Sequence, residues 1–173
     1  VYNNSNYVVD EIRLYSSSVN KFNGSRAVAE LIVLHKNNRG EYLAVCVPFI
    51  KTNSGAPSAH LLSKIVAATP TTKGTPTSVS ISNYSLNHFI PKAPFFSCRG
   101  ALPWDRSFKN VDYVIFNLQD TIAKIDNRTL ERLQRLIYSQ QFAKTKTTPF
   151  YHNETGSTNI GGGKKDDDIY IEC

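Results

Sequence analysis

Alternating hydrophobic and polar positions dominate the first third of the chain and predict β-strands. Residues 7–15 present two distinct faces, and a polar turn at 16–26 leads to a second predicted strand at 27–35. The turn signal at 37–40 precedes a nearly continuous apolar run, residues 41–51, typical of a buried strand. Pro48 interrupts this run, and because proline cannot donate a ladder hydrogen bond it indicates a bulge or an edge.

Two later segments have helical periodicity instead. Residues 57–68 carry an apolar stripe that Pro70 terminates, and Asp126 or Asn127 caps a predicted helix reaching about residue 142. Residues 77–83 predict a short strand, 87–106 an irregular Pro-rich stretch, and 111–118 a strand buried on both faces. The pattern predicts a mainly β domain with a few short helices.

The pattern changes near the carboxyl end, where the chain becomes polar. Residues 161–168 are glycine, lysine and aspartate only, which is typical of a flexible segment. The sequence therefore predicts one compact domain over residues 1–143 and an extension over residues 144–173. We expect its last apolar residues, 169–171, to add a strand to a sheet edge.

Composition narrows the class of protein. The 173 residues are 40% hydrophobic, which is typical of a globular domain, and no run approaches the 18 or so apolar residues of a membrane helix. A formal net charge of +6 favours attraction to polyanions. Cys46, Cys98 and Cys173 have no metal-ligand spacing and are expected to be free thiols. Asn-x-Ser/Thr sequons leave an extracellular location open.

The order of these elements and several local strings resemble the α-carbonic anhydrase family. Residues 29–35, Ala-Glu-Leu-Ile-Val-Leu-His, resemble that family's Ala-Glu-Leu-His-Leu-Val-His strand, and residues 7–15 fall where the family has Phe-His-Phe-His. Residues 100–104, Gly-Ala-Leu-Pro-Trp, resemble its Gly-Ser-Leu-Thr-Thr loop. The likeness covers about residues 7–136, without the family's leading segment. It implies a central twisted, mostly antiparallel sheet.

The resemblance also implies that the family's zinc site is lost. Arg13, Tyr15 and Ile32 match the three histidine ligands, and Pro103 matches the loop hydroxyl that orients the zinc-bound hydroxide. A guanidinium, a phenol and a hydrocarbon do not replace three neutral imidazoles, so no metal or other cofactor is expected. Glu30 matches a retained carboxylate. Since an unpaired buried carboxylate costs roughly 3 to 5 kcal/mol, we expect Arg13 to pair with it.

One cluster of basic residues is a candidate polyanion site. Lys124, Arg128, Arg132 and Arg135 recur at intervals of four, four and three, which places them on one side of the predicted helix, with Lys144 and Lys146 beyond. A solvated helix face opposite the leucine stripe explains the same pattern, and Glu131 weakens the basic character.

The resemblance leads to three functional hypotheses. Family members without the histidines include an adhesion protein of poxvirus particles that binds sulfated glycosaminoglycan, so a virion location is implied. The first hypothesis is a non-enzymatic structural module, such as a minor capsid protein that contacts other protein subunits. The second is an adhesin for sulfated glycan or another polyanion. The third, a hydrolytic enzyme with a relocated metal, is disfavoured because His35 has no second His or Cys nearby and no nucleophile motif is present.

Overall fold

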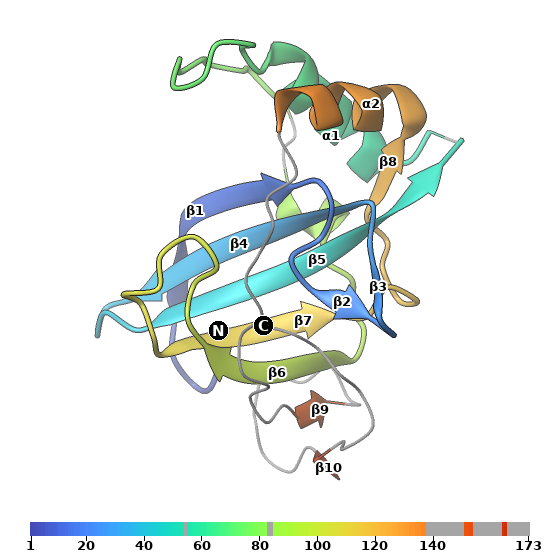
Figure 1. The fold of residues 1–173 in the computed structure, drawn as a ribbon. Coiled ribbons are helices and arrows are strands. Elements are labelled where there is room, and N and C mark those ends of the chain that lie inside the picture. The colour runs from blue at the N-terminus through green and yellow to red at the C-terminus, as the bar shows by residue number, and fades with distance from the viewer. Residues whose placement is uncertain (54, 83–84, 138–150, 154–163, 166–173) are drawn as a thin grey trace.

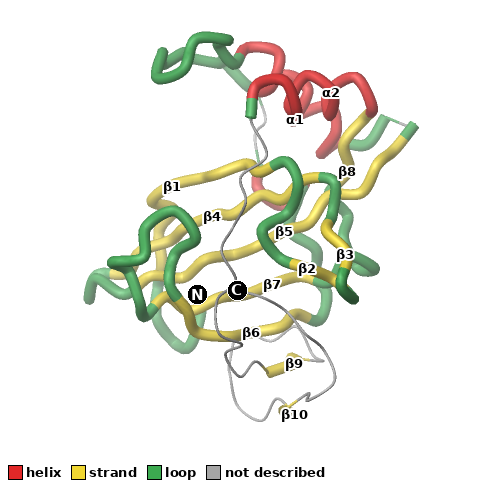
Figure 2. Tube along the Cα trace, viewed as in Figure 1, coloured by secondary structure: helices red, strands yellow, loops and turns green. Residues whose placement is uncertain are grey.

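The computed structural model describes residues 1–53, 55–82, 85–137, 151–153 and 164–165. A twisted sheet forms the centre of the fold, with strand order β1-β4-β5-β7-β6-β9-β10 (Figures 1 and 2). Its strands are β1 (Tyr7–Tyr15), β4 (Ala29–Asn37), β5 (Tyr42–Thr52), β6 (Phe95–Gly100), β7 (Val111–Phe116), β9 (Tyr151–Asn153) and β10 (Lys164–Lys165). β8 (Lys124–Asp126) pairs with β5 off this path.

Most neighbouring strands run antiparallel, but β5 is parallel to both β7 and β8. β5 pairs with β7 over Leu43–Cys46 and with β8 over Ile50–Thr52, and Pro48 lies between the two ladders. Because proline has no N–H, it fits where β5 changes partner. Pro48 therefore sits in a central strand, at a local gap where neither β7 nor β8 pairs with β5.

Three further short elements complete the described chain. β2 (Lys21–Phe22) and β3 (Ser25–Arg26) form a separate hairpin. Its turn residues Asn23 and Gly24 have φ of 49° and 78°, the left-handed pair that tight hairpins favour. A single 3₁₀ turn, η1, covers Leu86–His88.

Two helices lie side by side at one end of the sheet (Figure 1). α1 (Pro57–Ala68) has the predicted limits, with proline in its first turn. α2 (Asn127–Leu136) begins where Asp126 accepts a hydrogen bond from Thr129 N at 2.9 Å, as predicted. It ends earlier than predicted because Ile137 has an extended backbone. None of the described helices is long and apolar enough to cross a membrane.

Both faces of the sheet are buried under other parts of the chain. The helix-covered face carries Leu31, Val33, Val47 and Phe49, which pack with Leu61, Leu62, Val66, Leu130 and Leu133 of the helices. The loop-covered face carries Ile32, Leu34, Ala44 and Cys46, which pack with Val19, Phe22, Ala27 and Leu102. Alternate strand residues therefore enter separate clusters, as the two-residue period requires.

The amino-terminal residues fold back onto the sheet through a tight turn. Tyr2 and Ser5 exchange backbone hydrogen bonds of 2.9 and 3.0 Å, and Asn3 and Asn4 between them have positive φ. This turn buries Tyr2 in the helix-covered face.

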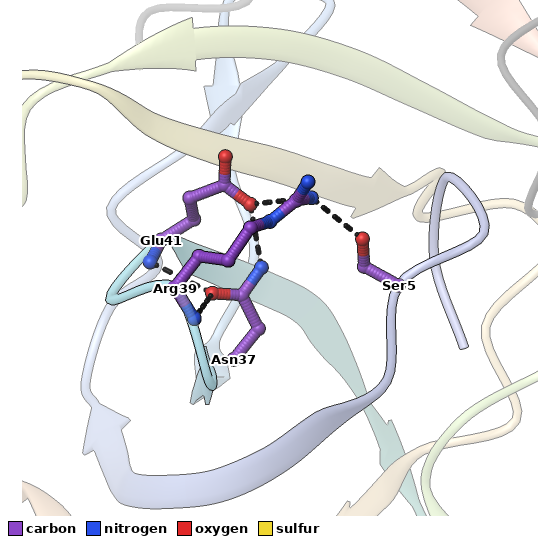
Figure 3. A network of polar contacts seen from close by, with 4 residues as sticks. All are labelled: Ser5, Asn37, Arg39 and Glu41. Atoms are coloured by element: carbon purple, nitrogen blue, oxygen red, sulfur yellow. Dashed lines mark hydrogen bonds and ion pairs between the residues drawn. The ribbon is translucent and has the colours of Figure 1, made fainter.

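A polar network ties this turn to the hairpin between β4 and β5 (Figure 3). Arg39 Nη2 lies 2.8 Å from Ser5 Oγ and 2.9 Å from Glu41 Oε2. Asn37 Oδ1 accepts hydrogen bonds from the backbone N–H groups of Arg39 and Glu41, both 2.9 Å. The predicted turn at residues 37–40 thus has a specific role in holding the amino-terminal segment.

Two local predictions are wrong. Residues 77–82 are not a strand: Val79 and Ile81 are half-buried in alternation, but no strand in the described part of the chain pairs with them. Cys98 is disulfide-bonded, whereas Cys46 is a buried free thiol. The predicted edge strand at 169–171 and the domain boundary at 143–144 lie outside the described residues, although β9 does pair with β6.

Candidate functional site

Four residues singled out by the sequence lie together on the loop-covered face. In the register of β1 and β4, Arg13 is opposite Ile32 and Tyr15 is opposite Glu30. Directly opposed residues of an antiparallel pair project from the same face, as do residues two apart on one strand. The structure therefore brings all four side chains to one area of the sheet, as the sequence predicts.

Arg13 and Glu30 do not form the expected pair. The Arg13 guanidinium lies 2.8 Å from Glu11 Oε1 on its own strand, and its Cζ is 4.4 Å from the centre of the Trp104 ring. Arg13 Nε has no hydrogen-bond partner among the described residues. Stacking on Trp104 and pairing with Glu11 keep the guanidinium at the half-exposed edge of the site, so the prediction of a buried Arg13–Glu30 contact is wrong.

Glu30 binds a loop instead of an arginine. This fully buried carboxylate accepts hydrogen bonds from Val19 N at 2.7 Å, Asn20 N at 3.1 Å and Asn20 Nδ2 at 2.8 Å. Burial raises the pKa of Glu30, although these three donors and the positive charge of Arg26 oppose the rise. Glu30 therefore anchors the loop between β1 and β2, and nothing in the sequence pattern indicates Asn20 as its partner.

Arg26 and Ser18 hold the same loop from the other side. Arg26 Nη1 donates to the carbonyl oxygens of Ser18 and Val19. Ser18 Oγ donates to Asn20 O at 2.5 Å and accepts from Ala27 N at 2.9 Å. Because these bonds satisfy the buried polar groups of the loop, residues 18–20 form a fixed cover over this part of the sheet.

Aromatic and aliphatic side chains fill the space beside Glu30. Tyr15 and Trp104 stack with ring centres 6.2 Å apart; Tyr15 belongs to the buried cluster of Ile32, Cys46, Leu102 and Tyr113, and the partly buried Trp104 packs against it. Tyr113 anchors the edge of the cluster through a 2.8 Å hydrogen bond to Ala101 O. The sequence analysis placed Trp104 in a loop and missed its role as the side chain that covers Tyr15 and Arg13.

No protein-family model and no curated protein sequence matches this chain, so the comparisons rest on solved structures. An α-carbonic anhydrase from Thermovibrio ammonificans, in complex with sulfanilamide, superposes with a TM-score of 0.71. It shares 13% identity, and the match covers 84% of this chain and 63% of that one. The chain has the α-carbonic anhydrase fold. An α-carbonic anhydrase from Photobacterium profundum superposes with a TM-score of 0.65, at 13% identity over 84% of this chain and 65% of that one.

A protein whose name is not that of an anhydrase matches equally well. Dioscorin, in a complex with ascorbate, has a TM-score of 0.68 at 14% identity, over 88% of this chain and 64% of that chain. At these identities the likeness is one of fold alone. The chain spans less than two-thirds of the length of each of these three proteins.

The side chains that the sequence resemblance places at the zinc-ligand positions, those of Arg13, Tyr15 and Ile32, do not fit that metal. Burial raises the pKa of Tyr15 to about 12, so a zinc ion would have to displace a tightly held proton to bind this phenol. Arg13 has no acceptor, and Ile32 has no polar atom. Pro103, which the sequence resemblance matches to the hydroxide-orienting residue, lacks a side-chain donor. No group of three or more His, Cys, Asp or Glu side chains that could hold a metal occurs within the described residues.

The basic residues of α2 do not form one continuous free face. Arg132 donates Nε to Val66 O and Nη2 to Ala67 O, both at 2.9 Å, and so satisfies carbonyls in the last turn of α1. Arg128 and Arg135 are exposed, as is Glu131, while Lys124 is half-buried in β8. Lys144 and Lys146 lie outside the described residues. Arg132 is thus a link between the helices rather than a free member of a polyanion site.

His35 lines a cavity of about 670 Å³ on the helix-covered face. Its Nδ1 lies 3.0 Å from Val33 O, and burial lowers the pKa of the imidazole. The other residues that line the cavity include Tyr7, Leu43 and Phe95 but no second His, Cys, Asp or Glu from the described part of the chain. Among the described residues that line this cavity, His35 therefore has no second metal-ligating side chain beside it.

Proposed function

We propose that this chain is a non-catalytic module with the α-carbonic anhydrase fold that works through protein–protein contacts, as a minor structural protein of a virus particle. The observation that carries the proposal is the chemistry of the former zinc positions. Arg13, Tyr15 and Ile32 offer no ligand set, and Trp104 packs against the first two. A catalytic zinc site needs three ligands and an open fourth position, and these side chains provide neither.

The retained carboxylate also has a structural role under this proposal. In a zinc enzyme a carboxylate of this kind orients a ligand histidine. Here all three hydrogen bonds to Glu30 come from Val19 and Asn20, so the residue stabilises a loop. The fold is kept while the groups that would perform chemistry are replaced, which is expected of a scaffold used for binding.

The virus-particle setting is tested by locating the chain in its native assembly. We expect purified particles to contain this chain in fixed proportion to the main shell protein, both before and after a wash at high salt. Salt screens contacts between exposed charges but leaves apolar contacts in place. A chain that is absent from purified particles, or found only as a free protein, would contradict the structural role.

Adhesion to a sulfated glycan is the alternative. The exposed Arg128 and Arg135 favour it, but the engagement of Arg132 with α1 reduces the available charge. An adhesin that binds through charge should instead be released from an immobilised polyanion at high salt. Binding to a polyanion releases counterions from each neutralised anionic group, so added salt weakens it.

A further inference from the structure

β1 is an edge strand with an unusual share of exposed apolar side chains. It pairs with β4 on one side, and no strand among the described residues pairs with its other side. Six large hydrophobic side chains are exposed in the described part of the chain, and three are on β1: Val8 at 70%, Val9 at 46% and Ile12 at 43%. An open edge with apolar side chains is a template for pairing with another strand.

The register of β1 limits where such pairing is regular. The pairing with β4 shifts between Val9 and Glu11, which leaves Asp10 as an extra, exposed residue. A bulge with a charged residue interrupts an edge and restricts pairing to the regular part of the strand. On β1 that part is Glu11–Tyr15, and Ile12 is its exposed apolar residue.

The charges that flank Ile12 are self-complementary. Glu11 and Arg13 lie on either side of Ile12 and form an ion pair of 2.8 Å within the chain, and their side chains are each still 38% exposed. If two copies of β1 pair antiparallel about Ile12, each Glu11 faces Arg13 of the other copy. Pairing about Glu11 would place the two Glu11 side chains opposite each other, and pairing about Arg13 would place the two Arg13 side chains opposite each other. Like charges directly opposite each other are destabilising. The sequence thus favours one register of self-pairing.

We propose that β1 is a self-association edge, through which two copies of this chain pair antiparallel about Ile12. The two sheets become continuous, with Ile12 against Ile12, and the Glu11–Arg13 ion pair of each copy faces the oppositely charged residues of the other copy. The contact uses the same strand on both copies, so it closes at a dimer. This inference deepens the assembly function proposed above and rests on it, because it names the partner of one contact as a second copy of this chain.

Sedimentation velocity of the full chain over a range of concentrations tests the proposal. We expect a concentration-dependent dimer whose dissociation constant rises at least about tenfold in Ile12→Lys. Ile122→Lys is the matched control, because Ile122 is 45% exposed, close to the 43% of Ile12, but lies in the segment before β8. The control should dimerise like the wild type.

Charge reversal tests the register independently of the isoleucine. Glu11→Arg and Arg13→Glu should each weaken the dimer when alone, and an equimolar mixture should form a heterodimer in which both cross-copy pairs join opposite charges. Circular dichroism identifies a charge-reversal variant that fails to fold. In that case the effect of Ile12→Lys on the dimer decides whether β1 is the contact. A wild type that stays monomeric, or a dimer that Ile12→Lys does not weaken, overturns the proposal. If such a chain is nevertheless a fixed component of its particle, the assembly function stands and only the self-contact fails.

Discussion

The side-chain amide of Asn20 donates to Glu30 Oε1 at 2.8 Å, and the two backbone N–H groups of Val19 and Asn20 donate to Oε2. The buried Glu30 carboxylate is therefore satisfied by a loop ten residues earlier in the chain. This contact closes the loop over the sheet and satisfies Glu30 without Arg13 beside it.

We predict that Asn20 and Glu30 are energetically coupled and that Arg13 and Glu30 are not. In a double-mutant cycle of Asn20→Ala and Glu30→Gln, the unfolding free energies should show a coupling of about 0.5–3 kcal/mol, as expected for residues in direct contact. The matched cycle of Arg13→Met and Glu30→Gln should be additive within about 0.5 kcal/mol. Urea unfolding of the single and double variants measures both. Strong coupling in the Arg13 cycle would show that Arg13 and Glu30 interact, and would contradict this prediction.

We also predict a pH dependence that belongs to Glu30. Burial raises its pKa in the folded protein above the ordinary value of about 4.3, so the folded state holds the proton more tightly than the unfolded state. The stabilising contribution is therefore complete below about pH 4.3 and is lost as the pH rises through the raised pKa. The advantage of the wild type over Glu30→Gln in unfolding free energy should fall across this range. A difference that is constant with pH, or grows as the pH rises, would show that the pKa is not raised.

The sequence predicted the local elements well where local chemistry decides them. The proline and the apolar stripe of α1 indicated its limits, and the alternation in residues 7–15 indicated β1 and the shared face of Arg13 and Tyr15. Contacts that depend on how a loop closes were not predictable in this way. Asn20 reaches Glu30 from a loop that bonds from Arg26 and Ser18 also hold, and neither periodicity nor spacing indicates these bonds. Val79 and Ile81 alternate like a strand, but alternation cannot reveal that a partner strand is missing from the described chain.

The helices provide a third prediction, on the role of Arg132. Arg132→Ala should lower the unfolding free energy by about 1–3 kcal/mol, because it removes two charge-assisted hydrogen bonds from the carbonyls that end α1. Arg135→Ala, an exposed arginine on the same helix, should change stability by no more than about 0.5 kcal/mol. Chemical denaturation compares the two. Equal losses in the two variants would show that the link between the helices contributes nothing to stability.

Heparin affinity measured on arginine variants of α2 tests whether these residues bind polyanions, separately from their effect on stability. If α2 binds polyanions, Arg135→Ala and Arg128→Ala should weaken retention on heparin and reduce its dependence on salt. Retention that none of these substitutions changes would leave the helix as a solvated surface.

The central proposal is that Arg13, Tyr15 and Ile32, which the sequence resemblance matches to zinc ligands, do not hold zinc. It is tested most directly by the zinc content of the folded wild-type chain after equilibration with zinc at neutral pH and removal of the unbound metal. Since Arg13, Tyr15 and Ile32 supply no ligand set, we predict far less than one zinc per chain. One tightly held zinc per chain, lost when Tyr15 is replaced by Phe, would contradict the account.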